Sequence, residues 1–394
     1  MACSGASATD ADIAHATMLV EREDSALLLA GVDRFARERV AVATARAETP
    51  IGPAELARLS KEAADLGMLP PATGERGFGI WEHVGHSDAM AFNIGALTRL
   101  GRANAAVAFA WHRTALARAV AGALDLELDA EDVLGTAFVS TGHYGLARTS
   151  AARWLKSAHL EADEVALLAD WLDRRAHATT MVAPGAWRWL LWPVWLGGRI
   201  AWQLARRDSL DVRPCRAQHG LDELSAFQVV EASATAVAKS PGDEVSRLVW
   251  GRALKMDMIG LLAIAAGALA RGQALATDYA AIRKQGGKII AGHPAVQRML
   301  SEIEIARHQA DVALESLARP VDALDIGAVV ATRAVTQALL CDAANQVVQL
   351  HGGIGYMREA GPEKIVRDEN MLKLQAGGTR EAHAFLAGWI GAFA

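Results

Sequence analysis

Hydrophobic residues recur at helical spacing in two long regions of the chain. Between about residues 19 and 134, apolar residues stand three and four positions apart, as in Leu28, Val32 and Phe35. The same period returns after Ser240-Pro241-Gly242 and continues to the end of the sequence. In this second region we expect long helices at about residues 244–283, 294–317, 326–349 and 378–394.

Between the two helical regions the pattern changes to short runs rich in β-branched and aromatic residues. These runs are Thr136–Ser140, Ala178–Val182 and Ala226–Val230, with glycine and proline residues between them. A helical period also occurs here, from Leu160 to Asp173. The pattern predicts a small β domain with one helical stretch inside it.

The order of these regions predicts a mainly α protein with a β insert. The first residues are small and polar, which is typical of a frayed terminus. We expect a disordered tail over residues 1–16, an N-terminal helical domain over 17–134, a middle domain that is a small β-barrel or sandwich over 135–240, and a C-terminal four-helix bundle over 241–394.

Composition narrows the classes of function. Hydrophobic residues make up 52% of the 394 residues, enough for packed cores and too many for a disordered chain. The 40 basic and 45 acidic residues give a net charge of −5, so no basic field for a nucleic acid is expected. Because Cys3, Cys215 and Cys341 share no close spacing and the histidines form no ligand pattern, we expect neither a disulfide framework nor a metal site.

No segment of the sequence predicts a location other than the cytoplasm. The start of the chain lacks the basic and apolar regions of a signal peptide. The longest apolar run, Ile259–Ala270, is shorter than a bilayer span and is flanked by charged residues. We therefore expect a cytoplasmic protein without a membrane span.

Four segments near the C-terminus resemble, in order, the motifs of one known family. Arg283-Lys284-Gln285-Gly286-Gly287 is similar to Arg-Lys-Gln-Phe-Gly, and residues 349–356 are similar to Gln-x-x-Gly-Gly-x-Gly-Tyr. Arg358-Glu359 with Arg367-Asp368 matches the segment that follows, and residues 377–381 stand where the family has Glu/Gly-Gly-Thr-Ser-Glu. On these segments the chain resembles the acyl-CoA dehydrogenase family.

The resemblance implies FAD as the cofactor and a homodimer or homotetramer as the assembly, because the first two segments would grip the FAD of a neighbouring subunit. Their chemistry suits this role, since arginine offers a planar fork of donors to a pyrophosphate and glycine lets backbone N–H groups approach a phosphate. The residues implied to hold FAD are Arg283, Gln285, Gln349, Gly352, Gly353, Thr379 and Glu381, together with Ser140 and Thr141.

The middle domain departs from the family pattern. The family's Thr-Glu-Pro-x-x-Gly-Ser-Asp loop, which lies under the flavin, would fall at Ser140–Gly145, where only hydroxyl and glycine character remains. His143 of this loop would lie where substrate and flavin meet, so it is a candidate substrate contact. The alternative for His143 is a loop histidine whose ring is satisfied by backbone groups.

The family needs a carboxylate that takes the α-proton of the acyl group, and its usual position here holds Gly377. A second branch of the family has its Glu on an earlier helix, 26 residues before the Arg of the first motif. Counting back from Arg283, 283 − 26 = 257, and residue 257 is Asp. Leu254, Leu261 and Ile264 share its helix face, so burial is predicted to raise the Asp257 pKa.

Asp257 is therefore the candidate base, and an ion pair with an arginine from elsewhere in the chain is the alternative. The Gly377 N–H would polarise the thioester carbonyl, and Gly378 would contact the substrate.

The resemblance implies FAD-dependent α,β-dehydrogenation of an acyl-CoA or acyl-carrier thioester, with electrons passing to an electron-transfer flavoprotein. Two alternatives stay open. One is a non-catalytic subunit of a hetero-oligomeric acyl-CoA dehydrogenase. The other is a flavoenzyme of the same fold with different chemistry, such as desulfination or oxygenation, which needs no α-proton base.

Overall fold

The computed structural model describes residues 25–69, 79–126, 128, 135–140, 148–173, 175–215, 218–231, 237–239 and 242–391. The predicted tail over residues 1–16 lies outside them. The first described helix starts at residue 25 and continues to residue 43 through a π-helical turn. The elements of this first part are η1 (Ala36–Val40), α2 (Ala41–Ala43), α3 (Pro53–Asp65), α4 (Ser87–Ala103) and α5 (Ala105–Ala123).

The described strands of the middle region form two sheets that pack face to face. One sheet has the order β1-β3-β4-β7, in which β1 pairs with β3 in parallel, and the other has the antiparallel order β2-β6-β5. Side chains of both sheets, among them Leu190, Trp192 and Val229, form one apolar core between them. The described strands are therefore a sandwich and not a closed barrel.

Two helices accompany these strands. The predicted helical stretch from Leu160 to Asp173 contains α8, and α7 before it was not predicted. The elements of the middle region are β1 (Thr136–Phe138), α7 (Arg148–Leu155), α8 (Ala162–Trp171), β2 (Thr179–Ala183), β3 (Trp189–Leu196), β4 (Arg199–Arg206), η2 (Arg207–Ser209), β5 (Leu210–Pro214), β6 (Ser225–Glu231) and β7 (Val237–Lys239).

The four helices predicted for the last region are present, and a fifth, α12, was not predicted. The short strands β8 and β9 form a hairpin between α9 and α10. The elements are α9 (Asp243–Ile282), β8 (Lys284–Gln285), β9 (Lys288–Ile289), η3 (Ile290–Gly292), α10 (Pro294–Leu317), η4 (Val321–Ala323), α11 (Ile326–His351), η5 (Gly352–Tyr356), η6 (Arg358–Ala360), α12 (Pro362–Leu374) and α13 (Thr379–Ile390).

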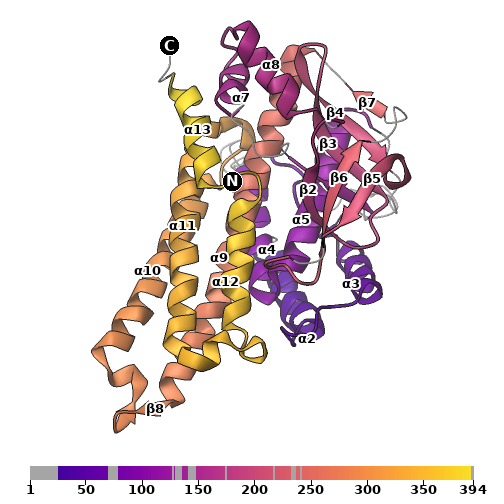
Figure 1. Ribbon diagram of the computed structural model, residues 1–394. Coiled ribbons are helices and arrows are strands. Elements are labelled where there is room, and N and C mark those ends of the chain that lie inside the picture. Colours follow the sequence, from indigo (N-terminus) through magenta and orange to yellow (C-terminus); the bar gives the residue numbers. More distant parts are fainter. Residues whose placement is uncertain are drawn as a thin grey trace, which may run out of the picture.

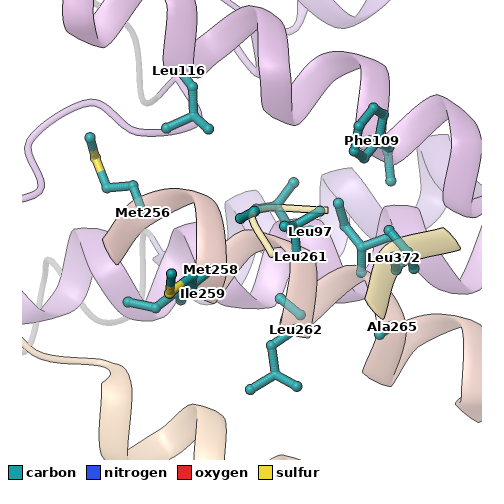
Figure 2. Close-up of a cluster of buried hydrophobic side chains, with 14 of the residues drawn as sticks. Leu97, Phe109, Leu116, Met256, Met258, Ile259, Leu261, Leu262, Ala265 and Leu372 are labelled. Carbon is teal, nitrogen blue, oxygen red and sulfur yellow. The ribbon is translucent and has the colours of Figure 1, made fainter. Parts of the chain in front are cut away.

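The longest helix, α9, is the centre of the fold. It packs against α4 and α5 on one side and against α10, α11 and α12 on the other, and the sandwich lies beyond α5 (Figure 1). Figure 2 shows its apolar side chains, Met256 to Ala265, among Leu97 of α4, Phe109 of α5 and Leu372 of α12. Because apolar residues surround α9 on every side in this stretch, a carboxylate placed there must find its polar partners inside the protein.

Two helical stretches, Asp243–Ile282 and Ile326–Tyr356, are long and apolar enough to cross a membrane by length and composition alone. In the first, 94% of the most apolar window is buried inside the protein, and in the second 56% is buried. Burial of 94% is that of the core helix of a folded domain.

Candidate functional site

A cavity of about 360 Å³ lies between the sandwich and the helical bundle. Its wall combines apolar rings and aliphatic groups with the hydroxyls of Ser140 and Thr180 and two guanidinium groups. The residues used below come from α5 (Phe109 and Arg113), the end of β1 (Phe138, Val139 and Ser140), β2 (Thr180, Met181 and Val182), α7 (Arg148) and the end of α12 (Leu374, Gln375, Ala376 and Gly377).

The carboxylate of Asp257 lies directly behind this wall. Its side chain is completely buried on α9. It accepts a hydrogen bond from His112 Nε2 at 2.9 Å, pairs with Arg113 Nη2 at 3.2 Å, and accepts a further hydrogen bond from Ser140 Oγ. Arg113 and Ser140 both line the cavity, so these two contacts connect the buried Asp257 carboxylate to the cavity.

A second hydrogen bond fixes the tautomer of His112. Trp81 Nε1 lies 2.9 Å from His112 Nδ1, and an indole nitrogen can only donate. His112 Nδ1 is therefore the acceptor, and Nε2 carries the hydrogen that is donated to Asp257. Burial lowers the pKa of His112 against the opposing effect of Asp257, so the imidazole is neutral.

Glycine at position 260 is what lets His112 reach Asp257. A Cβ at Gly260 would lie 2.2 Å from His112 Cε1, far inside van der Waals contact. Asp257 and Gly260 are three residues apart on α9 and share one face of the helix. Because Gly260 has no side chain, it leaves the space that the His112 imidazole fills.

The prediction that burial raises the Asp257 pKa is wrong. Leu254, Leu261 and Ile264 are buried as expected, and burial by itself would raise the pKa. The charge of Arg113 and the hydrogen bonds from His112 and Ser140 outweigh burial, and the Asp257 pKa lies below its usual value. The carboxylate is therefore ionised at neutral pH and has a lower proton affinity than predicted.

Gly377 lies in the wall of the same cavity, in a left-handed conformation with φ = +95°. Arg333 holds this segment, because its Nη1 donates to Gly377 O at 2.9 Å and its Nη2 donates to Gln375 O at 2.6 Å. A Cβ at Gly377 would lie 2.9 Å from Arg148 Nη2. The Arg148 guanidinium thus takes the space that a side chain at position 377 would need.

The next residues begin α13. Thr379 is the first residue of the helix, and the Glu381 carboxylate accepts a hydrogen bond from Gly378 N at 3.0 Å. This contact caps the N-terminus of α13. It holds Gly378 and the Gly377 turn next to the cavity.

The other predicted cofactor residues lie at the far end of the bundle. Arg283 follows Asp257 by 26 residues on or just after α9, a distance of about 39 Å along a helix. Tyr279 stacks on His351 at 4.6 Å, which brings the end of α9 to the turn at Gly352. Arg283, Gln285, Gln349, Gly352 and Gly353 are all exposed there.

Gly286, where the family has Phe, is the first of two turn residues between β8 and β9. Gly286 has φ = +59° and Gly287 has φ = +79°, values that suit glycine and a tight hairpin. Gly352 also has a positive φ, +61°, and no atom within 4 Å of a Cβ built there or at Gly353. The glycine turn is open to a ligand, and Gln349 beside it lines a groove of about 410 Å³.

Sequence reasoning missed His112, Arg113 and Arg148. The available signal was a His-Arg pair inside α5, a helix of otherwise mostly uncharged residues. The candidates Thr141 and His143 lie outside the described residues. Among the residues that the structure describes, no group of three or more His, Cys, Asp or Glu side chains is arranged to hold a metal ion.

Comparisons with known proteins found similar sequences and similar folds. A family model described as the C-terminal domain of acyl-CoA dehydrogenase matches residues 248–386. A probable acyl-CoA dehydrogenase, YngJ of Bacillus subtilis, is 31% identical over 125 residues, which are 30% of this chain and 32% of that protein. The 3-sulfinopropanoyl-CoA desulfinase of Paraburkholderia xenovorans is 26% identical over 139 residues, 35% of this chain and 36% of that protein.

The chain therefore spans about a third of the length of the curated relatives that it matches. The similarity of the whole chain is one of fold. A crystal structure of a glutaryl-CoA dehydrogenase from Mycobacterium smegmatis in complex with FADH2 superposes with a TM-score of 0.68 and 13% identity, covering 93% of this chain and 95% of that one.

Proposed function

The chain belongs to the acyl-CoA dehydrogenase family, and on this premise we propose that it is a flavin-dependent oxidoreductase that removes hydrogen from an acyl thioester carried by CoA or an acyl carrier protein. The observation that carries the proposal is the cavity between sandwich and bundle. It has Gly377 in its wall and the ionised Asp257 directly behind it.

The residues of the cavity fit FAD. Apolar side chains such as Phe138 and Met181 suit a planar ring system, and the hydroxyls of Ser140 and Thr180 offer polar contacts. Arg113 is 6% exposed, and among the described residues its Nε has no hydrogen-bond partner, so the cavity wall contains an unsatisfied buried donor. Thr379 and Glu381 lie next to this cavity and remain candidates for the cofactor.

We assign the adenine end of FAD to a neighbouring subunit in a homodimer or homotetramer. The support is the distance of about 39 Å between Asp257 and Arg283, which is longer than one dinucleotide spans. The exposed apolar residues Ile354 and Tyr356, which follow the glycine turn at that end, suit a subunit contact. In such an assembly Arg283, Gln285, Gln349, Gly352 and Gly353 hold the partner's cofactor.

Residues of the chain itself would remove the α-proton of the acyl group. FAD, when bound, supplies an acceptor for the hydride that leaves the β-carbon. The Gly377 N–H donates to the thioester carbonyl and makes the α-proton more acidic. Ser140 takes this α-proton while its hydroxyl hydrogen passes to Asp257, and the product is the α,β-unsaturated thioester. An electron-transfer flavoprotein would be the acceptor of the electrons.

The first test is absorbance of the purified protein, followed by anaerobic mixing with a panel of acyl-CoA thioesters. We expect a yellow protein whose flavin band bleaches. Asp257→Asn should slow bleaching by about 100-fold or more, because the terminal proton acceptor is lost. Asp278→Asn, an exposed position on the same helix, is the control and should bleach at the wild-type rate.

Circular dichroism and flavin content show whether Asp257→Asn still folds, and Asp257→Glu gives a second variant that keeps the charge. Bleaching of a folded Asp257→Asn protein at the wild-type rate would show that Asp257 is not the base. A colourless protein that gains FAD only with a copurified sister chain would favour the non-catalytic subunit.

One observation favours a second candidate function. The space at Gly377 holds a cation, Arg148, and the lowered pKa of Asp257 makes it a weak base. The desulfinase relative suggests a reaction in which the C–S bond of a sulfinate is hydrolysed to sulfite without net oxidation. Release of sulfite from 3-sulfinopropanoyl-CoA, without flavin bleaching, would select this candidate over dehydrogenation.

A further inference from the structure

Trp81 has a backbone conformation that is unusual for a bulky residue. Its φ of +66° lies in the left-handed region, which large side chains rarely adopt. The residue is only 3% exposed, and Asn93 Oδ1 of α4 accepts a hydrogen bond from its backbone N–H at 2.9 Å. Residues held in such conformations gather at functional sites. Here the conformation places the indole ring of Trp81 against the imidazole of His112.

The contact between these two rings restricts what the imidazole can do. The indole Nε1 donates to His112 Nδ1 at 2.9 Å, and the ring centroids lie 5.6 Å apart with an angle of 64° between the planes. An indole nitrogen donates and cannot accept, so the lone pair of Nδ1 must face it. A proton on Nδ1 would set two N–H groups against each other. The imidazole can therefore become an imidazolium only if Trp81 moves away.

The space at Gly260 is shared by both rings. A Cβ built there would lie 2.2 Å from His112 Cε1 and 2.8 Å from Trp81 Cζ2. His112 is completely buried, and among the described residues the charged groups that act on it are Asp257 of α9 and Arg113 of its own helix. Close packing on this side leaves the two rings little freedom to separate.

The two carboxylate oxygens of Asp257 have different partners. His112 Nε2 donates to Oδ1 at 2.9 Å, whereas Ser140 Oγ donates to Oδ2 and Arg113 Nη2 lies 3.2 Å from it. Ser140 and Arg113 line the cavity, and neither Trp81 nor His112 is among the described residues that do so. A proton that comes from the cavity therefore meets Oδ2, while Oδ1 already faces a hydrogen that the indole contact keeps on Nε2.

We propose that Trp81 and His112 are positioning residues for Asp257. The indole N–H keeps the imidazole neutral with its hydrogen on Nε2, so the proton from the substrate is received at Oδ2 of Asp257, on the side of Ser140. This inference rests on the proposed function, because it takes Asp257 as the proton acceptor. Neither ring touches the acyl group, and both act through the carboxylate.

The first measurement is nitrogen-15 NMR of purified protein labelled at its 12 histidines, with the His112→Gln variant to identify the signals of His112. We expect the imidazole of wild-type His112 to stay neutral, with its hydrogen on Nε2, between about pH 5 and 9, where an ordinary histidine titrates. An imidazolium at neutral pH, or a hydrogen on Nδ1, would overturn the inference. This result requires no position-81 variant to fold.

The second measurement removes only the indole donor. In Trp81→Phe the Nδ1 lone pair is free, so His112 should take up a proton within the same pH range and become an imidazolium beside Asp257. The flavin-bleaching rate, relative to wild type, should then fall by about tenfold per pH unit below this new titration. The matched control is Trp111→Phe. Trp111 is also buried on α5, but its indole donates to Ser60 Oγ at 2.8 Å.

The double variant Trp81→Phe, His112→Gln gives a further check, because a glutamine amide can donate to Asp257 but cannot take up a proton. It should lose the pH dependence that Trp81→Phe acquires. If the pH profiles of folded Trp81→Phe and Trp111→Phe run parallel, Trp81 has only a structural role and the inference is wrong. Failure of the proposed function looks different: the NMR signals of His112 behave as expected, but no thioester bleaches the flavin.

Discussion

Two carboxylates are completely buried among the helices, and their surroundings give them opposite properties. Asp257 on α9 meets Arg113, His112 and Ser140, and its pKa is lowered despite burial. Glu369 on α12 is also fully buried, and burial raises its pKa well above the usual value, because the hydrogen bond from Gln337 at 2.8 Å offsets little of that effect. Burial sets the cost of the charge, and partners from neighbouring helices decide whether the charge is kept.

Removing the cation from the Asp257 region should have the largest effect. Arg113→Met leaves a buried carboxylate without its charged partner, and we expect a loss of about 3–5 kcal/mol in the free energy of unfolding. Urea denaturation measures this. The control is Arg252→Met, which removes an exposed partner of Asp322 and should cost at most about 1 kcal/mol. Equal losses in the two variants would mean that Arg113 is not needed to keep Asp257 charged.

Displacing His112 should have a smaller effect. In Gly260→Ala the new methyl group collides with the imidazole, and we expect a loss of about 1–3 kcal/mol, with a rise of the Asp257 pKa as a hydrogen bond is lost. Gly251→Ala on the same helix meets only Leu155 Cδ2 at 3.7 Å and should be neutral or stabilising. A Gly260→Ala protein as stable as Gly251→Ala would contradict the close contact.

The pH dependence of stability sharpens the contrast between the two acids. Asp257 has a lower pKa folded than unfolded, so its stabilisation is present above about pH 4 and is lost as pH falls below this value. Glu369 has a raised pKa in the folded protein. Its unfolded form ionises first as pH rises above about 4.5, so it makes stability fall with rising pH, with a slope of at most about 1.4 kcal/mol per pH unit.

Thermal or urea unfolding between pH 3 and 8 separates the two effects. Glu369→Gln should become more stable than wild type as pH rises, because glutamine resembles the neutral acid that the folded protein prefers. Asp257→Asn should be less stable than wild type at neutral pH, with a difference that shrinks in acid. Parallel pH curves for the two variants would contradict the opposite pKa shifts.

Much of the helical architecture could be predicted from spacing. The helix expected at 294–317 has the bounds of α10, and α9 differs from its prediction by one residue at each end. Both carry regular apolar periods, and a proline starts α10. The unpredicted α12 is short and mostly polar or charged, so its apolar positions form no extended pattern.

The site could be predicted only in part. The position of Asp257 came from a count along the chain, but its partners His112 and Arg113 come from α5, 145 and 144 residues earlier. Spacing within one helix shows which residues share a face, and it carries no information about a side chain that a second helix places there. For this reason the apolar neighbours were predicted correctly and the direction of the pKa shift was not.

The 40 residues of α9 form one continuous helix about 60 Å long. One end supports the cavity of its own chain, and the other carries Arg283, which in the proposed assembly serves the cofactor of the neighbour. Each complete site then draws on two polypeptides. Consider two variants of this protein, one inactivated at the cavity end of α9 and the other at the Arg283 end. A mixed oligomer of the two would contain one intact site, which is the molecular basis of complementation between alleles of a single gene.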